Sequence, residues 1–205
     1  MQPTHQHKVK KNPGLMLFLL TFVFVGPMLF AWVMYVKSSN IDYKTTNAGV
    51  FVKPLTYISQ LSPHTLKKSP ILDSELLGKW WLIYLTPEIE HVKSQEIMYS
   101  MRQIQTALGK DAHRIDRMTL SVTPPSTQRM RFIKEFHPDL KQGLILSNDA
   151  HALFDSLHLP TESYDEGEFI IVDPHGQIVL HYNAALPAKG LLSDLKKLLH
   201  ASQIG

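Results

Sequence analysis

One short polar segment carries residue types from which acid–base or metal chemistry is commonly built. Glu88, Glu90 and His91 follow a continuous apolar run, and a helical pattern begins a few residues later. A carboxylate beside an imidazole can transfer protons, and the same two groups bind metal ions. Two acids and a histidine without a defined spacing are also typical of a solvated loop, and we favour that interpretation.

Two methionines near this segment are further candidates for metal binding. Met98 and Met101, with His91 close in sequence, supply thioether and imidazole groups that bind copper. Met101 shares a helical stripe with Ile97 and Ile104, so packing in the core is the preferred interpretation. The 11 histidines include no pair at metal-binding helical spacing with a third ligand nearby. The sequence also has neither a phosphate-binding loop nor a nucleophile elbow.

The composition excludes whole classes of chemistry. The chain has 205 residues and no cysteine, which excludes disulfides, thiolate metal sites, iron–sulfur clusters and thiol catalysis. The formal net charge is only +3 and the basic residues are spread along the chain, so nucleic-acid binding is not indicated. Once an N-terminal anchor is set aside, the remaining length suits one domain with a core of its own.

The N-terminal part contains a candidate membrane helix. The run from Leu15 to Val36 carries no charge, and at about 1.5 Å per residue it can cross a hydrocarbon core of about 30 Å. Pro27 predicts a kink, which a membrane helix tolerates. A cleaved signal peptide would have an apolar region of about 7–15 residues followed by a small-x-small cleavage site. This run is longer and no such site follows it, so we expect an uncleaved anchor.

The lysines on either side of this run predict its orientation. Lys8, Lys10 and Lys11 precede it, whereas only Lys37 follows closely. The positive-inside rule then places the N-terminus in the cytoplasm. The expected organisation is a cytoplasmic tail (1–14), a transmembrane helix (15–36), a linker (37–46) and one soluble domain (47–205) outside the cytoplasm.

Beyond the linker, apolar periodicity predicts alternating strands and helices. Strands are expected at Trp80–Leu85, Met118–Val122, Leu144–Leu146, Phe169–Val172 and Ile178–Leu180. Helices are expected from a Ser94 cap to a stop at Gly109, and at Met130–Phe136, Ala150–Leu157 and Leu191–Leu199. Val50–Leu61 contains Pro54 and is left open between an edge strand and an irregular segment.

The C-terminal part is the most regular. Asp173-Pro174-His175-Gly176 suits a type I turn between the last two strands. The last helix has leucines on one face, and its polar residues Ser193, Asp194, Lys196 and Lys197 are assigned to the opposite face. Alternating strands and helices imply a partly parallel sheet covered on both faces. A terminal hairpin followed by a helix narrows this to a thioredoxin-like α/β sandwich.

Four stretches carry a resemblance to a known family. They are Thr45–Gly49, Gly78–Trp80, Tyr99–Gln103 with Ala107–Lys110, and Val172–Gly176 continuing through Gly190 and Asp194–Leu199 to Ser202–Gly205. In order and spacing they resemble the small membrane-anchored thioredoxin-like proteins of bacterial cytochrome c oxidase assembly clusters, relatives of the Sco/SenC copper proteins. The resemblance implies a bacterial inner-membrane protein whose domain faces the periplasm and acts near oxidase assembly.

The chain departs from that family at the copper site. In Sco-like proteins, the loop after the first strand carries two cysteines separated by three residues, and a histidine before the hairpin completes the copper site. Counting from Tyr84 and Tyr99 places Glu90 and Ser94 at the two cysteine positions, and the histidine position falls near Asp165. A carboxylate and a hydroxyl do not replace the soft thiolates that select copper(I), and disulfide exchange needs a thiolate. We therefore expect no catalytic residue, no metal site and no cofactor.

The favoured hypothesis is a non-catalytic, membrane-tethered, thioredoxin-like protein that assists cytochrome c oxidase biogenesis through contacts with oxidase subunits or assembly factors. Two alternatives stay open. One is a copper carrier or redox factor that uses ligands other than cysteine. The other is a periplasmic interaction module unrelated to respiration.

Overall fold

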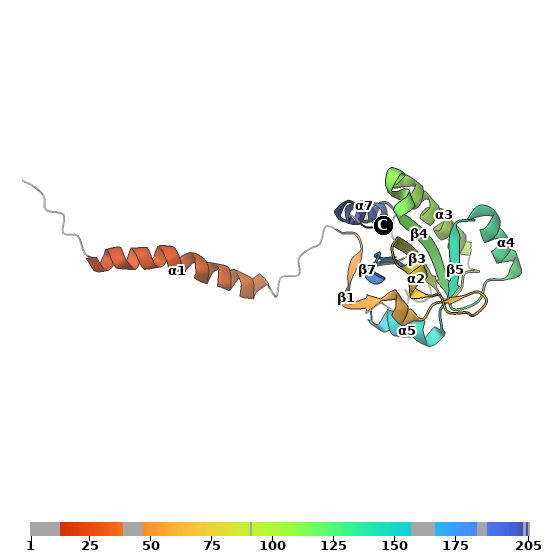
Figure 1. Ribbon diagram of the computed structural model, residues 1–205, viewed down its shortest axis with the longest axis horizontal. Helices are drawn as coiled ribbons and strands as arrows, with labels where there is room; N and C mark the ends of the chain where they lie inside the picture. Colours follow the sequence, from red (N-terminus) through yellow and green to blue (C-terminus); the bar gives the residue numbers. More distant parts are fainter. Residues whose placement is uncertain are drawn as a thin grey trace, which may run out of the picture. The chain divides into compact units, whose positions relative to one another are not determined.

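The computed structural model describes residues 13–38, 47–90, 92–156, 167–183, 188–202 and 204. The chain divides into two compact units, residues 1–46 and 47–205. In the described part of the first unit the chain forms the helix α1, and the second unit is built on a sheet with helices packed against it (Figure 1).

Helix α1 (Pro13–Ser38) is the apolar helix expected from the sequence. Its stretch Met16–Met34 has a mean hydropathy of 2.3 and is a candidate membrane span. No part of this stretch is buried within the protein, so packing in a protein core does not account for its apolar surface. The helix extends two residues beyond the expected run at each end, with Pro27 inside it.

The second unit contains one seven-stranded sheet with the strand order β1-β7-β6-β3-β4-β5-β2. The strands are β1 (Val50–Tyr57), β2 (His64–Thr65), β3 (Trp80–Thr86), β4 (Ile115–Ser121), β5 (Leu140–Leu144), β6 (Glu168–Val172) and β7 (Gln177–Asn183). β4 pairs in parallel with β3 and with β5, whereas the other pairings are antiparallel. The sheet is thus partly parallel, as the alternation of elements predicts.

Helices lie on both faces of this sheet (Figure 1). They are α2 (Asp73–Leu76), α3 (Val92–Ala107), α4 (Thr127–Phe136), α5 (Ser147–Ser156) and α7 (Ala188–Ala201), with the 3-10 helices η1 (Ile58–Leu61) and η2 (Gly109–Arg114). Apolar side chains of α3, α4 and α7 form one core with one face of the sheet, and those of α2, α5 and η1 form a second core with the other. Every residue of β3 is buried between these cores, because both its edges are paired and both its faces are covered.

Several local expectations are confirmed. Gly109, with a φ of +62°, follows the end of α3 and adopts the left-handed conformation that stops a helix. In the hairpin turn, the Gly176 N–H donates to the Asp173 carbonyl at 2.9 Å. The Asp173 carboxylate also accepts from the N–H groups of His175 and Gln177, at 2.9 and 2.8 Å. These bonds hold the two strands in register.

Other boundaries differ from the sequence-based expectation. α3 begins at Val92, so Ser94 lies inside the helix and does not cap it. The third strand is Leu140–Leu144, because pairing with β4 sets its position although Lys141 and Gln142 interrupt the apolar pattern. The open question at residues 50–61 is resolved as an antiparallel edge strand followed by η1.

Candidate functional site

The expected site begins where β3 ends, and its first position is Glu90. The Glu90 carboxylate accepts a hydrogen bond from the backbone N–H of Ser126 at 2.6 Å. The Arg129 guanidinium donates to the Glu90 backbone carbonyl at 2.6 Å, and its Nε lies 3.6 Å from the carboxylate. Ser126 is the N-cap of α4 and accepts from the Arg129 N–H. Glu90 therefore joins the loop after β3 to the first turn of α4.

The second position, Ser94, lies in the first turns of α3 and is fully buried. Its hydroxyl has no hydrogen-bond partner in the described structure. A buried hydroxyl at this place packs against the core and is closed to an incoming ligand. The third position, Asp165, and the neighbouring His91 lie outside the described residues.

The other sequence candidates have separate environments. Met98 and Met101 are both fully buried in the core between α3 and the sheet, which confirms the packing interpretation for Met101. Glu88 is exposed. Its backbone carbonyl, and not its carboxylate, accepts from the Thr86 hydroxyl at 3.1 Å. Across residues 13–38, 47–90, 92–156, 167–183, 188–202 and 204, no three histidine or acidic side chains gather in a metal-binding arrangement.

Copper, which the resemblance implies, does not fit the two donor groups that the structure describes. The Glu90 carboxylate is engaged by a backbone N–H and a guanidinium, and the Ser94 hydroxyl is buried. Both are oxygen donors, whereas copper(I) selects thiolate and thioether sulfur. The arrangement at the end of β3 acts as a structural connection between β3, α3 and α4.

A pair of buried ionisable groups lies on neighbouring strands at the same end of the sheet. Glu168 opens β6 opposite Leu85 of β3, and its carboxylate lies 3.6 Å from the Nδ1 of His181 on β7. Glu168 is 1% exposed and His181 is 8% exposed. Neither residue was singled out from the sequence as a site candidate. Each lies in a strand segment that is mostly apolar, which indicates packing. Their burial closes them to a substrate.

A further buried carboxylate brings together stretches from both ends of the domain. Asp194 of α7 accepts from the backbone N–H groups of Ala48 and Gly49, at 2.6 and 3.1 Å. It also accepts from the Tyr182 hydroxyl at 3.1 Å and from the Lys197 ammonium at 3.0 Å. We call these five residues the Asp194 clamp. It fastens the chain just before β1 to the C-terminal helix.

The clamp corrects the expectation that Asp194 lies on the solvent face of the last helix. Asp194 is 1% exposed. Its position three residues after Leu191 and four before Leu198 places it at the border of the apolar stripe, where a helix side chain is drawn towards the core. That spacing is the signal that sequence reasoning could have used.

Electrostatics keep the clamp carboxylate ionised. Burial by itself would raise the pKa of Asp194, but hydrogen bonds from Gly49, Lys197 and the other clamp donors favour the carboxylate and lower its pKa below the ordinary value of 3.8. Burial, together with the Asp194 charge, raises the pKa of Tyr182 far above its ordinary value, so its hydroxyl remains a donor.

Two glycines allow the close approach within the clamp. A Cβ at Gly49 would overlap the Tyr182 ring, and one at Gly190 would lie 2.6 Å from the Ala48 Cβ. Two of the stretches that carry the family resemblance, the one that ends at Gly49 and the one that contains Gly190 and Asp194, therefore meet at one place for a packing reason.

Comparison with protein families bears on the assignment of this fold. Residues 80–202 match the family described as transmembrane-like, thioredoxin-like, C-terminal domain, and this match covers more than half of the chain. The chain belongs to this family. A search of curated proteins finds no match.

Solved structures share the fold at low sequence identity. ScoI of Arabidopsis thaliana with copper bound has a TM-score of 0.54 at 15% identity, over 69% of this chain and 97% of that one. Yeast Sco1 with copper bound has a TM-score of 0.52 at 13% identity, over 68% and 86%. A thiol:disulfide interchange protein from Bacteroides sp. has a TM-score of 0.51 at 16% identity, over 78% and 95%. The expected thioredoxin-like sandwich and its likeness to Sco proteins are therefore confirmed at the level of the fold.

Proposed function

We propose that this protein is a membrane-tethered, non-catalytic, thioredoxin-like accessory protein that assists cytochrome c oxidase biogenesis through protein contacts. The four resembling stretches support the connection with oxidase assembly, and the family supports the thioredoxin-like domain. α1 supplies the tether as a candidate membrane span.

One observation carries the non-catalytic part of this proposal. Glu90, which counting along the sequence assigns to the first cysteine position of Sco-like proteins, is bound to Ser126 and Arg129 at the start of α4. With cysteine absent from the whole chain, electron transfer through a dithiol has no chemical basis.

The proposed topology follows from the charge on either side of α1. Lys8, Lys10 and Lys11 precede the apolar run, so we place the N-terminus in the cytoplasm and the thioredoxin-like domain in the periplasm. Retention of α1 keeps the domain within reach of inner-membrane oxidase subunits.

Affinity purification of the full-length protein from detergent-solubilised membranes tests the proposal. Oxidase subunits or assembly factors should be enriched with it, and deletion of the gene should lower the amount of assembled oxidase. Unchanged oxidase after deletion would remove the respiratory role and favour an unrelated interaction module.

Copper(I) titration of the full-length protein in detergent, against a chromophoric chelator, tests the metal-carrier alternative. The donor set predicts weak binding, because the soft ligands that hold copper(I) are absent from the end of β3. Tight binding that is lost on Glu90→Ala, His91→Ala or Met98→Leu would overturn the proposed function in favour of a copper carrier. The matched control is Glu88→Ala, which removes an exposed carboxylate from the same loop.

A further inference from the structure

The outer face of α3 carries polar and aromatic side chains that the core does not use. Tyr99, Arg102, Gln103, Thr106 and Ala107 line a shallow depression of about 570 Å³, which we call the α3 groove. Their spacing of three and four residues puts them on one side of the helix. Tyr99 is 57% exposed, whereas Met101, on the opposite side, is fully buried. The groove residues are therefore free to contact another molecule.

Arg102 is the charged side chain among the residues that line this groove. Arg102 donates to the backbone carbonyl of Phe136 at 2.9 Å, which joins α3 to the end of α4. Within the described part of the chain, Arg102 has no acidic partner. The one acid of α3, Glu96, lies in the preceding turn and outside the groove lining. The exposed cation of the groove is therefore not neutralised by an ion pair.

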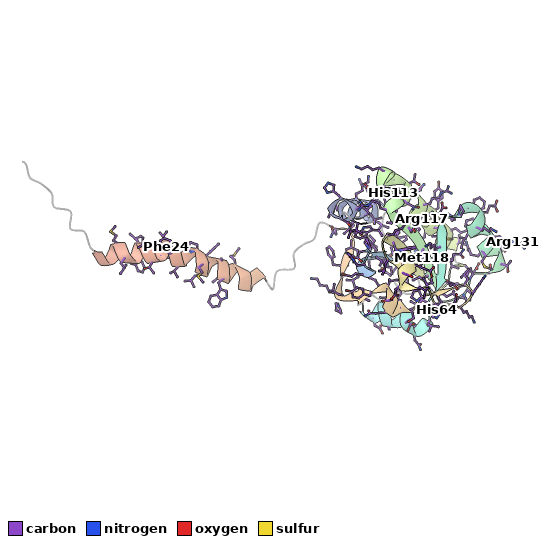
Figure 2. The ribbon with its side chains drawn as sticks, viewed as in Figure 1. Phe24, His64, His113, Arg117, Met118 and Arg131 are labelled. Atoms are coloured by element: carbon purple, nitrogen blue, oxygen red, sulfur yellow. The ribbon has the colours of Figure 1, made fainter. Side chains whose placement is uncertain are left out.

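A second arginine lies inside the domain and contacts α3. Arg117 of β4 is only 2% exposed, and its Nε donates to the Gln105 side chain of α3 at 2.6 Å. Its Nη1 has no partner among the described residues. Figure 2 shows Arg117 within the body of the domain and Arg131 on α4 at its outer edge. The carboxylates of Asp139 and Asp116 lie close enough to offset part of the charge of this buried guanidinium.

The neighbouring titratable groups show which charges act on Arg117. Burial is the main cause that lowers the pKa of Arg117; Asp139 and Asp116 oppose it, and the charge of Arg102 adds to it. Burial, followed by Arg117 and Arg102, lowers the pKa of His137. His137 therefore stays neutral beside two arginines near neutral pH.

We propose that the α3 groove binds an acidic segment of a partner protein, with a partner carboxylate on Arg102 and partner apolar surface on the Tyr99 ring. Tyrosine and arginine are the side chains that dominate binding energy in protein interfaces. Gln103 supplies an amide for a peptide backbone, and the Thr106 hydroxyl, which donates to the Arg102 backbone carbonyl at 2.9 Å, can still accept from a peptide N–H. This inference rests on the proposed function and names the face through which it acts.

Charge favours a protein partner over a lipid surface. Binding to an anionic bilayer draws on several Lys or Arg side chains, each contributing modestly. The groove presents one exposed cation, Arg102, among an aromatic, an amide and a hydroxyl side chain. That composition suits one directed carboxylate contact.

Binding is tested with the full-length protein in neutral detergent micelles and a fluorescent oligoglutamate peptide at low ionic strength. Arg102→Glu should weaken binding by about tenfold or more, the effect of losing one charged contact. Added salt should weaken binding as well. Arg131→Glu makes the same charge change on an exposed residue of α4 outside the groove, and it should leave binding within about twofold of wild type. Tyr99→Ala removes the aromatic contact but keeps the bond between Arg102 and the end of α4. Weaker peptide binding by this variant would therefore reflect a lost contact and not a lost fold.

Equal binding by wild type, Arg102→Glu and Arg131→Glu would overturn the proposal, as would no binding of oligoglutamate by wild type. Binding to phosphatidylglycerol vesicles that is lost on Arg102→Glu, without oligoglutamate binding, would assign the groove to lipid instead.

Complementation of a deletion strain separates this inference from the proposed function. Oxidase content is measured per amount of the protein in membranes. If deletion lowers oxidase, and Arg102→Glu and Tyr99→Ala fail to restore it while Arg131→Glu restores it, the groove is the partner-binding face. If all three variants restore it, the groove proposal is wrong and the proposed function stands. If deletion changes nothing, the proposed function fails, and the peptide titration alone decides the chemistry of the groove.

Discussion

Replacing Asp194 by alanine should strongly destabilise the thioredoxin-like domain. The change leaves two backbone N–H groups, of Ala48 and Gly49, and the Tyr182 hydroxyl without their acceptor. An unsatisfied buried donor costs about 1–3 kcal/mol, and bonds to a charged acceptor lie at the upper end. Because the three donors share one carboxylate, their costs do not add fully, and we expect a loss of about 3–5 kcal/mol. Domains of ordinary stability have about 5–15 kcal/mol in total.

The pH dependence of this effect follows from the lowered pKa of Asp194. A carboxylate whose pKa is lower in the folded state adds stability that is fully present above its unfolded value, here 3.8. That stability is lost as the pH falls through the native pKa. Asp194→Asn should therefore flatten the loss of stability on the acid side of pH 3.8.

Urea unfolding of the full-length protein in detergent, followed by tryptophan fluorescence, measures the change. Lys197→Ala is the control, because this ammonium is 47% exposed and its removal should cost less than about 1 kcal/mol. An Asp194→Ala variant within about 0.5 kcal/mol of wild type would show that the clamp does not hold the segment before β1.

Three further predictions follow from the fold and the topology. Leu195→Asp should prevent folding, because it buries a charge in a fully closed core position, whereas Lys196→Glu on the exposed face should change stability by at most about 0.5 kcal/mol; equal thermal melts would contradict this. Glu90→Ala should lower the free energy of unfolding by about 1–2 kcal/mol, because the Ser126 N–H at the start of α4 loses its acceptor; a value matching Glu88→Ala in urea unfolding would exclude this role. A periplasm-active reporter fused after Gly205 should be active, and activity of a cytoplasm-specific reporter alone would reverse the topology.

Local periodicity was sufficient for much of the fold. The central strand at residues 80–86 is an unbroken apolar run, and the hairpin turn is signalled by Pro174 and Gly176 at fixed positions. Such signals lie within a few neighbouring residues, where sterics and side-chain spacing act directly. The strand at residues 140–144 lacked such a pattern, and its position came from pairing with β4.

The candidate site was predictable in chemistry but not in geometry. The absence of cysteine and the oxygen donors at positions 90 and 94 follow from the sequence. The bond between Glu90 and the start of α4 does not follow from the sequence, because Ser126 lies 36 residues further along the chain. Only the packing of α4 against the sheet brings the two together.

The sequence by itself determined an apolar N-terminal helix, a cysteine-free domain and an alternation of strands and helices that specifies a thioredoxin-like sandwich. The tertiary structure alone decided the environment of individual polar groups. Asp194 meets Gly49 across 145 residues of chain, and Arg117 is buried near Arg102, Asp139 and Asp116. Burial and charge partners depend on contacts between distant segments, which no local pattern encodes, and these contacts give Asp194 its structural role.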